Sequence, residues 1–145
     1  MPPDHEDSNE RMAREALLSR VPIPEEQVHP LCSTDVELPD RFDLVLLGIG
    51  PDGHCASLFP RDPALEATEP IVRVEHPGLP PYHPRLTFTY PVLNGATATA
   101  FLVGGSSKRE IVERVLAGDT SLPAARVAAA ETIMLVDEEA APVSA

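Results

Sequence analysis

The sequence has few cysteines, few basic residues and no long apolar run, and each shortage excludes a class of protein. Its 2 cysteines, Cys32 and Cys55, are too few for a disulfide framework and lack the spacing of a metal site. No apolar run approaches the length that spans a membrane, and the polar start over residues 1–7 lacks the features of a signal peptide. These absences favour a cytoplasmic protein.

Basic residues are outnumbered by acidic ones. The chain has 11 Lys and Arg residues against 23 Asp and Glu residues, which gives a formal net charge of −12. Nucleic acids and anionic membranes are recognised through basic faces, so neither is expected as a partner. The same charge repels anionic ligands at long range, so a phosphorylated ligand would need a few cations gathered at its site.

What the chain does have is proline, 17 residues that mostly separate segments of helical and extended character. Helices are expected over residues 7–20 and 107–117, a helical turn over 91–96 and a short helix from Ala56. Met12 and Leu17 are expected to belong to the buried stripe of the first helix. Strands are expected over residues 42–48, 71–75, 85–90, 99–103 and 132–136, with a short extended piece at 28–31.

The expected strands are mostly apolar runs rather than alternations of apolar and polar residues. Such runs are typical of parallel strands that are covered on both faces, and residues 44–47 are expected to form a buried strand. With helices between the strands, the sequence predicts an α/β fold with an open, mostly parallel, doubly wound sheet and helices on both faces. The length of 145 residues predicts a single domain over residues 1–145.

A glycine-rich turn follows residues 44–47, with three glycines within six residues, Gly50 and Gly53 among them. In an open parallel sheet, ligands bind where strands end. Asp52 and His54 stand two residues apart in this turn; His54 could accept a proton from water while Asp52 orients the imidazole. The alternative is an ordinary turn, in which Asp52 caps a helix and His54 packs locally.

The same turn can be compared with three other motifs. It contains the G-x-G-x-x-G spacing of a dinucleotide-binding loop, but it lies in mid-chain and no acidic residue ends a following strand at the expected distance. No Gly-Lys-Ser/Thr follows, which excludes a Walker loop. Cys55 beside His54 suggests a cysteine nucleophile, but a nucleophile and its base are usually distant in sequence, so Cys55 is interpreted as a small packing residue.

Two cations are candidates for binding an anion. Lys108 stands at the start of the second expected helix, after the glycines of residues 104–105, and backbone N–H groups at a helix N-terminus bind anions. A cation there opposes the helix dipole, which favours a role toward a ligand over a solvated lysine. Arg85 begins a strand and could face the same anion, although an arginine at a strand start is usually solvated. The other histidines show no metal-ligand spacing.

Residues 47–60, LGIGPDGHCASLFP, resemble the signature of the 6-phosphogluconolactonase family, in which threonine is usual at the Cys55 position. Segments within residues 7–29, 85–94 and 108–119 extend the resemblance over nearly the whole chain. The resemblance implies the fold of the sugar-phosphate isomerases. It also implies hydrolysis of a phosphorylated sugar lactone, 6-phospho-D-glucono-1,5-lactone, in the oxidative pentose phosphate pathway, without a metal or nucleotide cofactor.

By this resemblance, His54 is the base that activates water and Asp52 positions it. The residues that we assign to substrate or phosphate binding are Gly50, Gly53, Ser57, Arg85 and Lys108. Backbone N–H groups near the glycine turn are expected, beyond the resemblance, to stabilise the oxyanion that forms on the lactone carbonyl.

Two departures from the family pattern keep other functions open. The family's first strand, Gly-Gly-Ser loop and acidic-Arg motif would precede Met1, and the segment over residues 32–41 is short. The chain therefore resembles the C-terminal part of a lactonase with a sheet incomplete at the N-terminus, and a non-catalytic sugar-phosphate-binding protein is one alternative. The other is an isomerase or deaminase of the same fold. The related glucosamine-6-phosphate deaminase carries a glutamate near the Phe59 position, and Phe59 cannot titrate.

Overall fold

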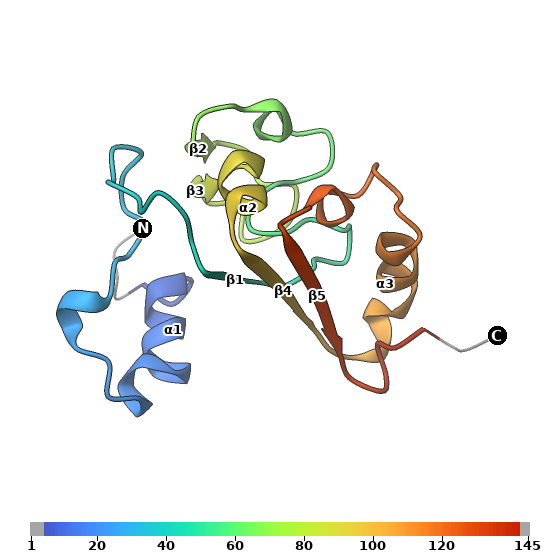
Figure 1. The fold of residues 1–145 in the computed structure, drawn as a ribbon, viewed down its shortest axis with the longest axis horizontal. Coiled ribbons are helices and arrows are strands. Elements are labelled where there is room, and N and C mark those ends of the chain that lie inside the picture. The colour runs from blue at the N-terminus through green and yellow to red at the C-terminus, as the bar shows by residue number, and fades with distance from the viewer. Residues whose placement is uncertain (1–4, 143–145) are drawn as a thin grey trace. The chain divides into compact units, whose positions relative to one another are not determined.

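The computed structural model describes residues 5–142, and the chain divides into two compact units, residues 1–33 and 34–145. The described helices of the first unit are α1 (Asn9–Ala16), η1 (Leu18–Arg20) and η2 (Glu25–Gln27). The strands of the second unit are β1 (Leu44–Leu47), β2 (Ile71–Val74), β3 (Arg85–Phe88), β4 (Ala98–Val103) and β5 (Glu131–Val136) (Figure 1). Its helices are η3 (Pro63–Glu66), α2 (Tyr90–Gly95), η4 (Ser106–Lys108), α3 (Arg109–Leu116) and η5 (Pro123–Arg126).

Helix α1 is shorter than the sequence predicted and buries none of its residues. It begins after Ser8, whose hydroxyl accepts the first capping hydrogen bond, and η1 replaces the expected last turn. Met12 and Leu17 are more than half exposed, so the predicted buried stripe is wrong. The extended piece expected at residues 28–31 forms no strand.

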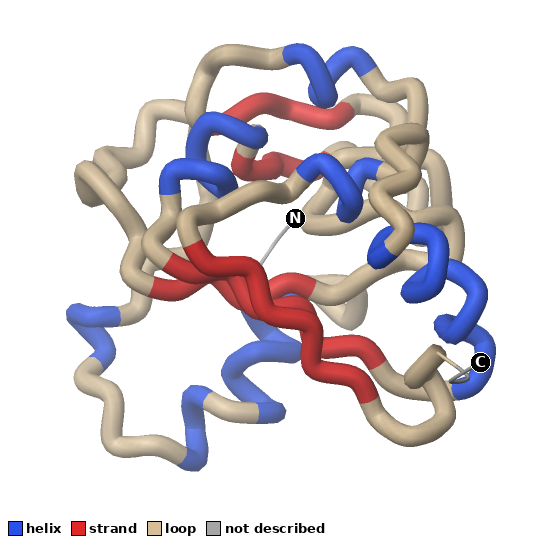
Figure 2. The backbone as a smooth tube through the Cα atoms, turned by 45° about the vertical axis from the view of Figure 1, so that its right-hand side comes forward, coloured by secondary structure: helices blue, strands red, loops and turns tan. Residues whose placement is uncertain are grey.

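Strands β1, β4 and β5 form a parallel sheet in the order β1-β4-β5. Strands β2 and β3 pair antiparallel as a separate two-stranded sheet. Figure 2 shows the three parallel strands side by side, with the loops and helices of this unit connecting them. The predicted α/β fold with a mostly parallel sheet is confirmed, and the five strands lie within a few residues of their predicted positions.

The two faces of the parallel sheet differ in burial. Leu47 and Phe101 point into the core, together with buried residues of α2, α3 and the connecting loops. Because side chains alternate along a strand, Leu44 and Leu46 point to the opposite face, where they are 53% and 57% exposed. The prediction of a fully buried strand at residues 44–47 is therefore wrong, since β1 is an edge strand with one uncovered face. The exposed leucines of the sheet are Leu44, Leu46, Leu102 and Leu135.

Two helix predictions also need correction. Helix α3 buries Ile111 and Val112, but the first turn of the expected helix is the separate η4, and neither element has a side-chain cap. The helix expected from Ala56 does not form, because Ala56 has φ +50°, outside the right-handed helical region. An isolated β-bridge between Cys55 and Leu58 closes this segment instead.

The carboxyl ends of the three parallel strands lie at one edge of the sheet. Strand β1 leads into residues 48–54, β4 into residues 104–108, and β5 into residues 137–139. A parallel sheet presents its ligand sites at this edge. Over the described part of the chain, no helix combines the length and apolar character that crossing a membrane requires.

Candidate active site

Asp52 and His54 form a hydrogen-bonded pair at the carboxyl end of β1. His54 Nδ1 lies 2.6 Å from Asp52 Oδ1, and the same oxygen accepts the His54 backbone N–H at 3.2 Å. Because a carboxylate can only accept, this contact assigns a proton to Nδ1, and in the neutral imidazole the lone pair is then on Nε2, at the other side of the ring. The His54 side chain is 21% exposed, so the ring borders solvent. The pair has the arrangement of a base held by a carboxylate.

Gly50 and Gly53 give the turn its shape. Gly50 N–H donates to His54 O at 2.8 Å, and Gly53 N–H donates to Gly50 O at 3.0 Å. A Cβ at Gly50 would lie 2.0 Å from His54 Nδ1, so the imidazole can lie against the backbone here because residue 50 has no side chain. Gly53 has φ +82°, and a Cβ there would meet Leu122. The turn thus needs glycine at both positions. That Gly50 and Gly53 contact a substrate stays a prediction.

The amides of this turn are engaged within it. Gly50 and Gly53 donate to backbone carbonyls, and His54 N–H donates to Asp52. The expectation that amides near the glycine turn stabilise an oxyanion is therefore wrong for these three groups.

Two neighbouring residues limit what the pair can do. Phe59 is 3% exposed, and its ring centroid lies 4.5 Å from that of His54, so it packs on the imidazole without exchanging a proton. Cys55 is fully buried, and burial raises the pKa of its thiol to about 12. A thiol with such a pKa is not a thiolate at neutral pH, which supports the interpretation of Cys55 as a packing residue.

Lys108 reaches the turn from the end of β4. Its Nζ donates to Ile49 O at 2.7 Å, which places the ammonium group beside the turn that carries Asp52 and His54. An ammonium has three N–H groups, so two stay available for a ligand. The structure thus brings the predicted cation and the predicted base to the same edge of the sheet.

The backbone amides that precede Lys108 are already occupied. Gly105 N–H donates to Asp137 Oδ2 at 2.8 Å, and Ser106 N–H donates to Glu139 Oε2 at 3.3 Å. Hydrogen bonds from the N–H groups of Ala140 and Gly105 hold the pKa of Asp137 below its usual value. We expected amides at this helix start to bind a ligand anion. For Gly105 and Ser106 this is wrong, because their N–H groups already donate to the carboxylates of residues that follow β5.

Arg85 and Ser57 hold other positions. The Arg85 guanidinium donates to the carbonyls of Pro81 and His83, and burial lowers its pKa. Within residues 5–142 no hydrogen bond joins it to the Asp52–His54 turn, so its contact with phosphate stays a prediction. Ser57 is buried, and its N–H donates to Thr87 Oγ1 at 3.1 Å, which ties the segment after the turn to β3.

Three residues that hold this region were not predicted from the sequence: Thr87, Leu122 and Ala124. Ala124 N–H donates to Gly53 O at 3.0 Å, and Leu122 packs where a Gly53 side chain would be. No local pattern marks these residues, because each acts through a backbone or packing contact with a segment far away in the sequence.

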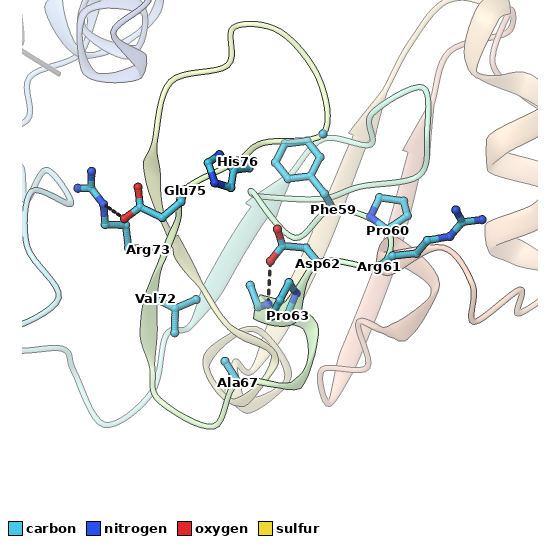
Figure 3. Close-up of a pocket in the computed structure, with 12 residues that line it drawn as sticks. Phe59, Pro60, Arg61, Asp62, Pro63, Ala67, Val72, Arg73, Glu75 and His76 are labelled. Atoms are coloured by element: carbon cyan, nitrogen blue, oxygen red, sulfur yellow. Dashed lines mark hydrogen bonds and ion pairs between the residues drawn. The ribbon is translucent and has the colours of Figure 1, made fainter.

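A groove of about 540 Å³ opens on the side of Phe59 where Gly78 packs. Figure 3 shows Phe59 and His76 at its wall, and Arg73 paired with Glu75. None of the seven predicted site residues lines it. The groove borders the candidate site across Phe59 and does not contain it. The described residues also hold no group of three His, Cys, Asp or Glu side chains that could bind a metal ion.

The sequence of the chain matches a known family. The model described as glucosamine-6-phosphate isomerases/6-phosphogluconolactonase matches residues 1–135. The chain belongs to this family. The 6-phosphogluconolactonase of Synechocystis sp. is 38% identical over an alignment of 162 positions, which covers 94% of this chain and 66% of that protein. The 6-phosphogluconolactonase of Nostoc sp. is 40% identical over an alignment of 136 positions, which covers 79% of this chain and 55% of that protein.

The solved structures agree with this family assignment. The crystal structure of 6-phosphogluconolactonase from Thermotoga maritima matches with a TM-score of 0.81 at 32% identity. The match covers 94% of this chain and 67% of that one. The chain spans 66% of the length of the Synechocystis relative and 55% of the length of the Nostoc relative.

Proposed function

We propose that this chain hydrolyses 6-phospho-D-glucono-1,5-lactone to 6-phosphogluconate. The observation that carries the proposal is the Asp52–His54 pair, joined at 2.6 Å, with the Lys108 ammonium fixed to Ile49 of the same turn. A lactone needs a base that activates water, and a phosphate ester needs a cation nearby. The names of the Synechocystis and Nostoc relatives support the same chemistry.

His54 supplies the proton transfers of the proposed reaction. Nε2 takes a proton from water as the water oxygen attacks the lactone carbonyl, which forms a tetrahedral intermediate. Asp52 accepts the Nδ1 hydrogen bond and stabilises the imidazolium that this step creates. When the intermediate collapses, the bond between the carbonyl carbon and the ring oxygen breaks, and Nε2–H returns the proton to that oxygen.

Lys108 is proposed to bind the phosphate. Its two remaining N–H groups suit a phosphate oxygen, and its bond to Ile49 O pre-orders a long side chain that would otherwise lose entropy on binding. Arg85 is proposed as a second phosphate contact. Two of its N–H groups donate to the carbonyls of Pro81 and His83, and the remaining N–H groups would donate to the phosphate. The reducing cytoplasm is the compartment we propose.

The neutral wall at Phe59 favours the lactonase over a deaminase. Phe59 packs on the His54 ring and carries no group that titrates. Ammonia release from glucosamine 6-phosphate tests the deaminase directly, and we expect none.

A coupled assay for 6-phosphogluconate tests the proposal against the spontaneous rate of lactone hydrolysis. We expect the wild-type chain to exceed this rate and His54→Ala to lose the excess, since general-base catalysis contributes about 10²–10⁴-fold. His29→Ala is the matched control, because His29 is an exposed histidine in the first unit. Calorimetry with 6-phosphogluconate separates a binding protein from an enzyme. Binding without turnover, or full activity in His54→Ala, would refute the proposed function.

A further inference from the structure

Helix η5 holds the turn that carries the candidate base. Its Ala124 N–H donates to Gly53 O at 3.0 Å, one residue before His54 and one after Asp52. Leu122, which precedes η5, occupies the space beside Gly53, since a Cβ at Gly53 would lie 2.8 Å from Leu122 Cδ2. The position of η5 therefore sets the position of the peptide between the two members of the pair.

Tyr90 in turn holds η5. Its hydroxyl donates to Pro123 O at 2.9 Å in a buried contact, and the Arg126 guanidinium lies 4.7 Å from the centroid of its ring. Burial raises the pKa of the Tyr90 phenol, which keeps the hydroxyl protonated as a donor. Arg126 also donates to Glu66 Oε1 at 3.0 Å, so the ring is covered by a cation that is itself fixed.

A phenylalanine would fill the same space as Tyr90 and stack under Arg126 equally well. The Tyr90 hydroxyl adds one hydrogen bond, to the carbonyl oxygen of Pro123, which is the residue next to Ala124. The contacts form a continuous connection from α2 through η5 to Gly53. A connection of this kind fixes a catalytic group to the accuracy that catalysis needs.

We propose that Tyr90 is a positioning residue for the Asp52–His54 pair, acting through Pro123 and Ala124. The proposal rests on the proposed function for its kinetic part, because His54 must be the base for its orientation to affect turnover. The orientation itself can be observed without any substrate, since the Asp52 contact holds the proton on Nδ1 of the ring.

The test compares Tyr90→Phe with Tyr82→Phe, which removes a hydroxyl from a tyrosine that is 67% exposed. We expect kcat for the lactone to fall about 10-fold in Tyr90→Phe, because a small misplacement of a catalytic group is costly. KM should stay near the wild-type value, because Lys108 and Ile49 lie outside the contacts from Tyr90 to Gly53. In ¹⁵N spectra of labelled histidine, the His54 signal should move from the Nδ1–H tautomer toward a mixture. Tyr82→Phe should match the wild type in every measurement.

Each outcome decides one of the two proposals. A wild-type kcat and an unchanged His54 tautomer in folded Tyr90→Phe would overturn the positioning role. A wild-type chain without lactonase activity would overturn the proposed function, and the tautomer would still test Tyr90. If Tyr90→Phe does not fold, Leu122→Ala removes the side chain against Gly53 and must shift the same His54 signal for the positioning role to stand.

Discussion

Replacing Gly50 with alanine tests whether the contact between the turn and the imidazole is needed. The new Cβ would lie 2.0 Å from His54 Nδ1 and 2.1 Å from Cε1, against 3.4 Å for ordinary contact. The ring must therefore withdraw by ~1.4 Å, which breaks a hydrogen bond that now measures 2.6 Å. Without the hydrogen bond to Asp52, the His54 ring is no longer oriented and its proton is no longer held on Nδ1. We therefore expect kcat to fall by about 100-fold or more.

The coupled 6-phosphogluconate assay measures this loss, with urea unfolding to establish that the variant is folded. Gly48→Ala is the control, because a Cβ at Gly48 meets nothing within 4 Å. We expect it to keep both the wild-type rate and the His54 tautomer. A folded Gly50→Ala with the wild-type kcat would refute the reasoning, and so would a Gly48→Ala that loses as much activity as Gly50→Ala.

Two other predictions concern a thiol and a carboxylate. Cys55→Ala should keep its kcat and lose about 1–2 kcal/mol of unfolding free energy from a small cavity, measured by urea unfolding; loss of turnover in a folded variant would restore the nucleophile interpretation. Asp137→Asn tests the contact with Gly105. The folded pKa of Asp137 is lowered, so its contribution is complete above its unfolded pKa of about 4 and disappears as pH falls through the folded value. The stability gap between wild type and Asp137→Asn should therefore close at low pH, and a constant gap would contradict the contact.

The sequence was most informative where local chemistry and topology agree. The apolar run at residues 44–47 predicted β1, and the glycines after it predicted a turn at the carboxyl end of the strand. Two residues in that turn, Asp52 and His54, can reach each other without help from the rest of the fold, so their pairing was predictable. The approach of Lys108 to the same turn followed from the rule that parallel strands end at one edge.

What could not be predicted depends on contacts between distant segments. An apolar run does not reveal which of its side chains face a neighbouring layer, so the exposure of Leu44 and Leu46 was missed. From the sequence, the amides of Gly105 and Ser106 were expected to be free to bind an anion. They instead donate hydrogen bonds to carboxylates that lie about 30 residues later in the chain. Tyr90 carries no motif, because its hydroxyl bonds to a backbone carbonyl, and any residue provides one.

The turn of residues 48–54 is held by several other elements of its unit, and this arrangement has a mechanistic reason. A two-residue separation lets Asp52 hold His54, but the pair as a whole can still rotate with the loop that carries it. Lys108 fixes the turn at Ile49, before the pair, and η5 fixes it at Gly53, between Asp52 and His54. Thr87 fixes the segment that follows. Because orientation is established before a substrate arrives, its entropic cost is met by folding rather than by binding. Substitutions at these supports should therefore lower kcat more than they raise KM, except at Lys108, which also faces the phosphate in the proposed complex.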